Sequence, residues 1–502
     1  MPEEPRSVPV IVGVGQVVDR PQDPTAGREP LALMDEAVRR GAEDAGGGRA
    51  LLDAVDMLAV VNVVCHDYGD APGLLADRLG IRPARTIYTT LGGNTPQSLV
   101  GHLCDEIAAA RVGVAVVAGA EAWHTARSLG RAGKPAGWPH REPSQKPWGD
   151  GRPGVHEYEI RHGIGQPIVT YPMADNAFRA ARGLGLEAHR RELAEFSARC
   201  AAIAARNPYA WFRDAKDAET LATVSPDNRM VGFPYPKFMN AILDVNQGAA
   251  LVLASEASAR RLGLAADRWV YPWATVDVTE HWFFKDRVDY HTLPGVRRAA
   301  AALFETAGVD VGAVRYLDLY SCFPIAPRLS AAMLGIAPDD PRPLTAAGAL
   351  PWFGGPGNNY TTHAIATLVE RLRADRDGTA VVHALGWNLT KHALGVYGGC
   401  LPARGWRRAG GPALQATVDA LPHPAIATEA NGPGTIETYT IVHGRDGAPE
   451  RAPVIGRLDD GRRFLATIAG DATVLAALER EELVGRRGRV THRDARNRFE
   501  VA

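Results

Sequence analysis

The sequence predicts an α/β protein made of two similar halves, followed by a small barrel of antiparallel β-strands. Up to about residue 400, apolar strand segments alternate with helical segments, as in a parallel or mixed sheet covered on both faces. A turn, Gly92-Gly93-Asn94, recurs within residues 355–359, with Asn94 aligned on Asn359 at a shift of 265 residues. After residue 434, short stretches of alternating apolar and polar residues replace the helices, which is typical of antiparallel strands.

The length of 502 residues exceeds that of one ordinary core, so two or three domains are expected. We place the first half at residues 1–265, with an inserted loop domain at about 123–238. The second half follows at 266–405. A linker at 406–433 leads to the barrel at 434–502.

Composition excludes several classes of protein. A formal charge of -1 gives no electrostatic footprint for nucleic acid, and no apolar run reaches the roughly 20 residues of a membrane span. The start, Met1-Pro2-Glu3-Glu4-Pro5, lacks the basic and apolar regions of a signal peptide. The five cysteines are widely spread and form no CxxC pair, so neither a metal site nor a disulfide framework is expected. A cytoplasmic location fits this cysteine usage best.

The elements of the first half follow from their patterns. They are the strand Val8–Gln16, the helix Pro30–Ala45, the strands Val55–Val64 and Thr86–Thr90, a helix over about Pro96–Ala110 and the strand Gly113–Gly119. The first strand lacks the third glycine of a dinucleotide-binding turn, so no nucleotide cofactor is expected there. The turn at Gly92-Gly93-Asn94 directs backbone N–H groups at the helix start, where negative charge is favoured. In the insertion, Glu187–Asn207 is one clear helix.

The second half repeats this order. Its elements are the helix Pro294–Ala307, a strand at Ala313–Leu319, the helix Thr361–Ala374, and the strands Thr379–Leu385 and Ala393–Gly398. In the tail, two strands around Asp459-Asp460-Gly461 form a hairpin pattern. Five or six short strands there predict a barrel.

At these residues the chain resembles the thiolase superfamily, in particular sterol-carrier-protein-type thiolases and acetyl-CoA acetyltransferase-like proteins. The resemblance covers about residues 8–402. It rests on the duplicated halves, on IVGVGQ in the first strand, on VNQGAALVLAS in a later strand, and on Tyr320-Ser321-Cys322-Phe323 in place of the family's His-Asp-Cys-Phe motif. The resemblance implies a five-layered αβαβα sandwich with an inserted loop domain, and coenzyme A thioesters as ligands with no permanently bound cofactor. The resemblance implies pairing of two chains through the strand near residues 86–90. The sequence leaves two oligomeric states open for this chain, a monomer and a homodimer.

The chain departs from the family at the reacting groups. A thiolase needs a thiolate at a helix N-terminus and a histidine that activates it. Counting back from Gly119-Ala120-Glu121 puts the nucleophile position at Gly93 or Gly92. Gly355 stands in place of the activating histidine, and Tyr320 replaces the histidine of the third motif. The standard thiolase reaction is therefore expected to be absent, and glycine at the nucleophile position is expected to leave extra room.

Several residues remain as site candidates. The catalytic candidates are Cys322 and His392. The candidates for substrate or coenzyme A binding are Gly92, Gly93, Asn94, Tyr320, Phe323, Gly355, Pro356, Gly357, Asn358, Asn388 and Lys391. His363, one turn into its helix, is expected at a surface or interface.

Three functions are weighed. The first is a thiolase-like protein of lipid metabolism that binds acyl-CoA or a related acyl group without the thiolase reaction. The second is a non-enzymatic scaffold that holds a protein partner through the C-terminal barrel, which resembles OB-fold portions of accessory proteins that dock onto thiolases. The third is an acyltransferase that works through Cys322 or Cys65. Within the first, the barrel is expected to pack on the thiolase-like body.

Overall fold

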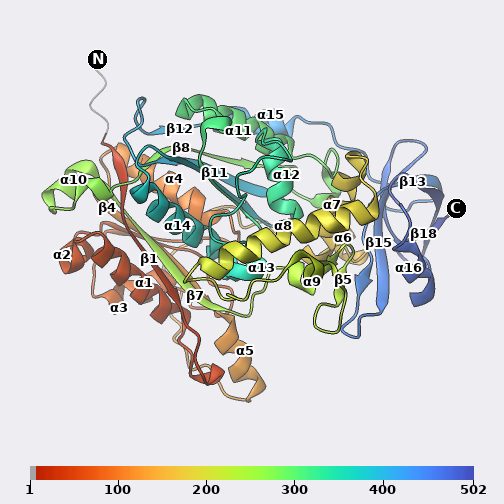
Figure 1. Ribbon diagram of the computed structural model, residues 1–502, viewed down its shortest axis with the longest axis horizontal. Coiled ribbons are helices and arrows are strands. Elements are labelled where there is room, and N and C mark those ends of the chain that lie inside the picture. The colour runs from red at the N-terminus through yellow and green to blue at the C-terminus, as the bar shows by residue number, and fades with distance from the viewer. Residues whose placement is uncertain (1–6) are drawn as a thin grey trace.

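The computed structural model describes residues 7–502 and confirms an α/β fold with two similar halves (Figure 1). The strands of the first half are β1 (Pro9–Val18), β2 (Met57–Val60), β3 (Arg85–Tyr88), β4 (Val114–Ala122) and β7 (Asn246–Ser255). Those of the second half are β8 (Tyr271–Thr279), β9 (Tyr316–Leu319), β10 (Thr379–Gly386), β11 (Lys391–Gly398) and β12 (Arg407–Arg408). The sheet orders are β1-β7-β4-β2-β3 and β12-β8-β11-β10-β9. In both, two antiparallel pairings are followed by a parallel one (β4–β2 and β10–β9), so the repeated turn belongs to a repeated strand order.

Five layers follow from the helix positions. Helices α4 (Thr95–Ala108) and α14 (Tyr360–Ala374) lie between the two sheets, and their apolar side chains join those of both sheets in one core. The outer face of the first sheet is covered by α1 (Pro30–Asp44) and α3 (Ala71–Leu79), next to α2 (Gly48–Asp53), with α10 (Glu256–Arg261) at its end. The outer face of the second sheet is covered by α11 (Pro294–Ala307) and α12 (Ile325–Met333) (Figure 1). Both middle helices begin directly after the aligned asparagines, Asn94 and Asn359.

The inserted segment is mainly helical. Its elements are α5 (Trp123–Arg131), α6 (Glu157–Arg161), α7 (Pro167–Ala181), α8 (Leu186–Arg206), α9 (Ala218–Ala222), β5 (Met230–Gly232) and β6 (Tyr235–Pro236). Two short helices lie elsewhere, α13 (Leu350–Phe353) and α15 (Pro412–Asp419). No helix within residues 7–502 is both long enough and apolar enough to span a bilayer.

A closed five-stranded barrel follows α15, as the sequence predicts. It consists of β13 (Gly432–Tyr439), β15 (Pro449–Leu458), β16 (Arg463–Ile468), β17 (Arg487–Arg493) and β18 (Arg496–Val501). Four of its pairings are antiparallel, and β16 pairs with β18 in parallel after the helix α16 (Ala472–Leu478). The short strand β14 (Val442–His443) joins the barrel to β5.

The barrel packs on the thiolase-like body through buried polar groups. Arg463 of β16 is fully buried and donates to the backbone carbonyls of Lys285 (2.9 Å) and Val288 (3.3 Å). Asn497 of β18, also buried, donates to the hydroxyl of Tyr158 at 2.9 Å. These groups would be costly to bury without their partners, so the barrel and the body form one structural unit.

The outer edge of β3 is covered within the chain. The backbone N–H of Trp148 donates to the carbonyl of Tyr88 at 2.7 Å, and Thr90 N–H donates to the carbonyl of Trp148 at 2.9 Å. The side chain of Gln145 donates to the carbonyl of Thr86 at 3.0 Å. An edge strand covered in this way has few free backbone groups to pair with another chain.

Candidate functional site

The two repeated turns meet at the starts of α4 and α14. Gly92 N–H donates to Asn358 Oδ1 at 2.9 Å, and the Asn358 amide donates to the carbonyl of Asn62 at 3.0 Å. The hydroxyl of Thr361 donates to the carbonyl of Gly93 at 3.2 Å. The predicted binding residues Gly92, Gly93 and Asn358 are therefore brought together at the interface between the halves.

The turn at Gly92 and Gly93 is tightly filled. A Cβ atom on Gly93 would lie 2.5 Å from Tyr320 Oη and 2.5 Å from the carbonyl oxygen of Leu385. On Gly92, whose φ is +153°, it would lie 2.8 Å from Lys391 Nζ. The extra room expected from the sequence is thus absent, because Tyr320 and Lys391 of the second half occupy it.

Tyr320 and Lys391 reach the turn from different strands. Tyr320 follows β9, and its ring packs edge-on against Tyr360, with 5.6 Å between ring centroids. Lys391 begins β11, is 4% exposed, and donates from Nζ to the carbonyl of Leu91. Burial lowers the pKa of Lys391 to about 8, and the Asp150 carboxylate opposes this shift.

Cys322 is a buried thiol in an aromatic setting. Next to it, the ring of Phe323 stacks on Tyr171, with 4.6 Å between ring centroids. Burial raises the pKa of Cys322 to about 12, although the hydroxyl of Tyr171 opposes the shift. Cys322 is therefore a protonated thiol at neutral pH.

His392 forms a pair with a histidine that sequence analysis did not single out. His392 Nδ1 and His383 Nε2 lie 2.9 Å apart, and His392 Nε2 lies 3.1 Å from the carbonyl oxygen of Leu389. Burial lowers the pKa of His383 to about 3 and lowers that of His392 as well, so the pair is neutral. The pair could have been found from the spacing of the two histidines, because both lie near the same end of the hairpin formed by β10 and β11.

Residues 388–390 are held by a buried arginine. Arg287 donates to the carbonyls of Leu389 (2.6 Å) and Asn388 (3.0 Å) and to the hydroxyl of Thr390 (2.9 Å). The side chain of Asn388 accepts from Thr170 of the insertion at 2.9 Å. Asn388 therefore has partners already, and Arg287 fixes the loop that precedes Lys391.

The second turn borders a buried carboxylate. Gly355 N–H donates to the carbonyl of Ile242 at 2.8 Å, and Pro356 and Gly357 follow. Gly357, with φ +53°, has no space for a Cβ because Glu121 lies against it. Glu121 accepts from the backbone N–H of Cys65 at 2.9 Å, and burial raises the pKa of Glu121 to about 7. Burial and the Glu121 charge also raise the pKa of the Cys65 thiol.

His363 is placed differently from expectation. It is fully buried on α14 rather than at a surface, because α14 lies between the two sheets. Its Nδ1 lies 2.9 Å from Gln16 Oε1, and burial lowers its pKa to about 3.

Comparison with known proteins places this geometry in a family. Residues 413–495 match the family model "Thiolase-like protein type 1 additional C-terminal domain". A crystal structure of a monomeric SCP2-thiolase like protein type 1 from Mycobacterium smegmatis is 34% identical, covers 100% of both chains and superposes with a TM-score of 0.85. The chain belongs to the SCP2-thiolase-like protein type 1 family.

More distant structures share the fold with this SCP2-thiolase-like chain. An Ltp2-ChsH2(DUF35) aldolase is 17% identical, with a TM-score of 0.59, over 78% of this chain and 98% of that one. Acetyl-CoA acetyltransferase from Syntrophomonas wolfei is 14% identical, with a TM-score of 0.56, over 79% of this chain and 100% of its own. No curated protein matches the sequence.

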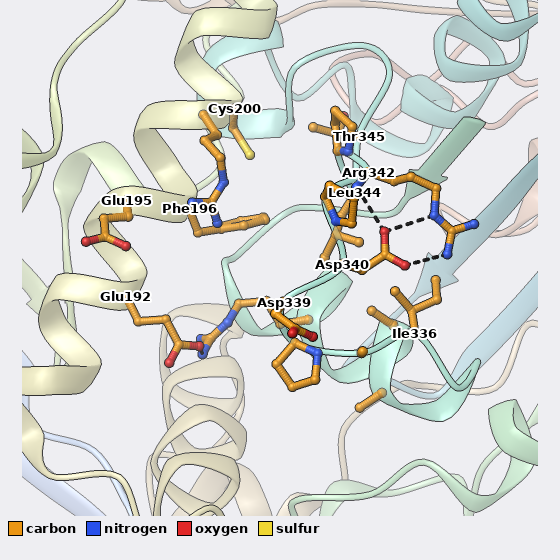
Figure 2. A pocket seen from close by; sticks show the side chains of 18 of the residues that line it. Glu192, Glu195, Phe196, Cys200, Ile336, Asp339, Asp340, Arg342, Leu344 and Thr345 are labelled. Carbon is orange, nitrogen blue, oxygen red and sulfur yellow. Dashed lines mark hydrogen bonds and ion pairs between the residues drawn. The ribbon is translucent and has the colours of Figure 1, made fainter. Parts of the chain in front are cut away.

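A groove of about 770 Å³ lies elsewhere on this SCP2-thiolase-like protein, between α8, α12 and the loop 336–345. Figure 2 shows Phe196 and Cys200 of α8 on one side and Thr345 of the loop on the other, with Arg342 turned toward Asp340. None of the predicted site residues lines the groove. Within residues 7–502, no group of three or more His, Cys, Asp and Glu side chains is arranged to hold a metal ion.

Proposed function

We propose that the protein binds a coenzyme A thioester or a related acyl group and does not perform the standard thiolase reaction. The absence of the standard thiolase reaction is inferred from the close packing around Gly93. A thiolate at Gly93 would need space that Tyr320 Oη and the Leu385 carbonyl occupy.

Other candidate groups supply no replacement for the missing chemistry. Cys322 remains protonated because its pKa is raised to about 12, and a thiol attacks a thioester poorly. Gly355 has no side chain that could activate a nucleophile. The buried pair of His383 and His392 is already bonded internally and neutral.

The binding part is supported by membership of a thiolase-like family and by the retained turns. Residues that are partly exposed border these turns. Leu91 is 43% exposed, and Asn94, Asp150 and Trp387 are half-buried. Backbone N–H groups at a helix start favour a polarised carbonyl or an anion.

Titration calorimetry with coenzyme A and acetyl-CoA tests binding, and thiolysis of acetoacetyl-CoA tests the reaction. We expect heat of binding and no thiolysis above the uncatalysed rate. Absence of any coenzyme A affinity would show that the binding part is wrong.

Mass spectrometry after incubation with acetyl-CoA tests the acyltransferase alternative. An acyl group on Cys322 or Cys65 would support that alternative and contradict the proposal. An acyl group on Cys322 would be lost in Cys322→Ala, and one on Cys65 would be lost in Cys65→Ala; Cys400→Ala, which changes an exposed thiol, is the matched control.

A further inference from the structure

We propose that Lys391 is a carbonyl-reactive amine that forms a Schiff base with the ketone of a 3-oxoacyl ligand at the Gly92 turn. The proposal rests on the proposed function for the class of ligand and adds a covalent step to it. It begins from position, since the Lys391 side chain crosses from the second half to the Gly92 turn at the start of α4.

The contacts of Lys391 depend on two glycines. Cβ atoms on Gly92 and Gly386 would lie 2.9 Å and 3.2 Å from Lys391 Cε. Only glycines therefore leave a channel for the four-carbon chain, which ends with Nζ bonded to the carbonyl of Leu91. The amine is held at Gly92, beside the N-terminus of α4.

Lys391 also lacks the partner that buried lysines need to stay charged. Among the described residues, 7–502, no carboxylate lies within ion-pair distance of its Nζ. The Asp150 carboxylate, which acts to raise the pKa of Lys391, is already bonded to Arg152 at 2.7 Å. By contrast, Lys285 pairs with Asp286 at 2.7 Å. The burial that lowers the pKa of Lys391 to about 8 is consistent with an amine that is partly neutral near physiological pH.

Two neighbouring groups suit the chemistry of an imine. Tyr320 Oη lies at the adjacent glycine, and burial raises its pKa, so the phenol stays protonated. Asn94 Oδ1 is buried at Gly92 without a hydrogen-bond partner. The Tyr320 phenol and the Asn94 amide oxygen therefore lie at the same turn as the Lys391 amine.

The neutral Lys391 amine attacks the ketone carbon, and a proton passes from its nitrogen to the oxygen to give a carbinolamine. The Tyr320 hydroxyl donates a proton to the departing oxygen, water leaves, and a protonated C=N bond replaces the C=O bond. The iminium nitrogen then returns its proton to the Tyr320 oxygen, which leaves a neutral imine and a neutral phenol. The imine is reversible, whereas attack on the thioester carbon would form a stable amide and block the site.

Reductive trapping tests the proposal on the full-length protein. The probes are acetoacetyl-CoA and, separately, acetoacetate, each with sodium cyanoborohydride near pH 8, followed by peptide mapping. The protein has six lysines, so each can be followed separately. We expect a mass gain equal to the ketone less one oxygen atom at Lys391, about ten-fold or more above the other lysines, because an amine with ordinary pKa is almost fully protonated at this pH.

Matched variants and parallel calorimetry separate the outcomes. Lys391→Met should lose the label, and Lys237→Met, which changes an exposed lysine, should keep it. The wild-type peptide map gives the answer even if Lys391→Met does not fold. Labelling spread evenly over the lysines, or a mass gain that forms without reductant, overturns the proposal.

Calorimetric binding of coenzyme A without trapping would refute the Schiff base and leave the proposed function standing. Trapping of acetoacetate at Lys391 without any coenzyme A affinity would support the Schiff base and refute the proposed function.

Discussion

Replacing Arg463 with methionine removes a buried polar anchor between the barrel and the body. Arg463 is fully buried, pairs with Glu437 at 2.7 Å and donates to the carbonyls of Lys285 and Val288. Breaking one side of a buried ion pair costs about 3–5 kcal/mol. Glu437 keeps a second partner, Arg457 at 2.6 Å, so we expect the lower end, about 3 kcal/mol. That is a large part of a typical stability of about 5–15 kcal/mol.

Urea unfolding followed by tryptophan fluorescence measures this loss, and limited proteolysis shows whether the barrel is released first. Arg457→Met is the matched control because Arg457, which is half-buried, pairs with the same carboxylate and otherwise bonds to the carbonyl of Gly461 within the barrel, so we expect a smaller loss. Equal destabilisation by the two substitutions would refute the idea that Arg463 anchors the barrel.

Four further outcomes are expected. Gly93→Cys should restore no thiolysis of acetoacetyl-CoA and should lower stability by about 1–3 kcal/mol through overpacking against Tyr320, as measured by urea unfolding. Because burial lowers the pKa of His363 to about 3, the unfolded chain binds its proton first. The contribution of neutral His363 to the free energy of unfolding is therefore fully present above about pH 6.5 and is lost below it, by up to about 1.4 kcal/mol per pH unit. In His363→Gln, the free energy of unfolding should fall less steeply as the pH is lowered, as measured by urea unfolding at a series of pH values. Cyanoborohydride trapping at Lys391 should rise with pH through about 8 and then level off, and a pH-independent yield would contradict this. Sedimentation velocity should show a monomer for the wild type, while Trp148→Pro, which removes the N–H bonded to the edge strand, should show some self-association.

The fold could be predicted from local and repeated patterns. The aligned asparagines at 94 and 359 precede equivalent helices, and the alternation after residue 434 predicted the barrel. These features depend on neighbouring residues or on a repeat, which a single sequence contains.

The filling of the turn could not be predicted in the same way. Lys391 lies about 300 residues from Leu91 in the sequence and Tyr320 more than 200 from Gly93, so their meeting depends on how the halves pack. A glycine in place of a nucleophile predicted empty space at the turn. Protein interiors are closely packed, however, and larger side chains from the opposite half fill that space. The His383–His392 pair was missed for a related reason, since a lone histidine on a strand gives no sign of its cross-strand neighbour.

The covalent attachment of the barrel has a consequence for any protein partner. A docking module that is covalently linked to its partner is present at its binding surface at an effective concentration that reaches the order of millimolar. A separate protein that competed for the surface of the body contacted by β16 and β18 would need a comparable free concentration before it displaced the barrel. Partners of this protein are therefore expected to bind at the remaining surface of the barrel or at the body, and to leave that contact intact.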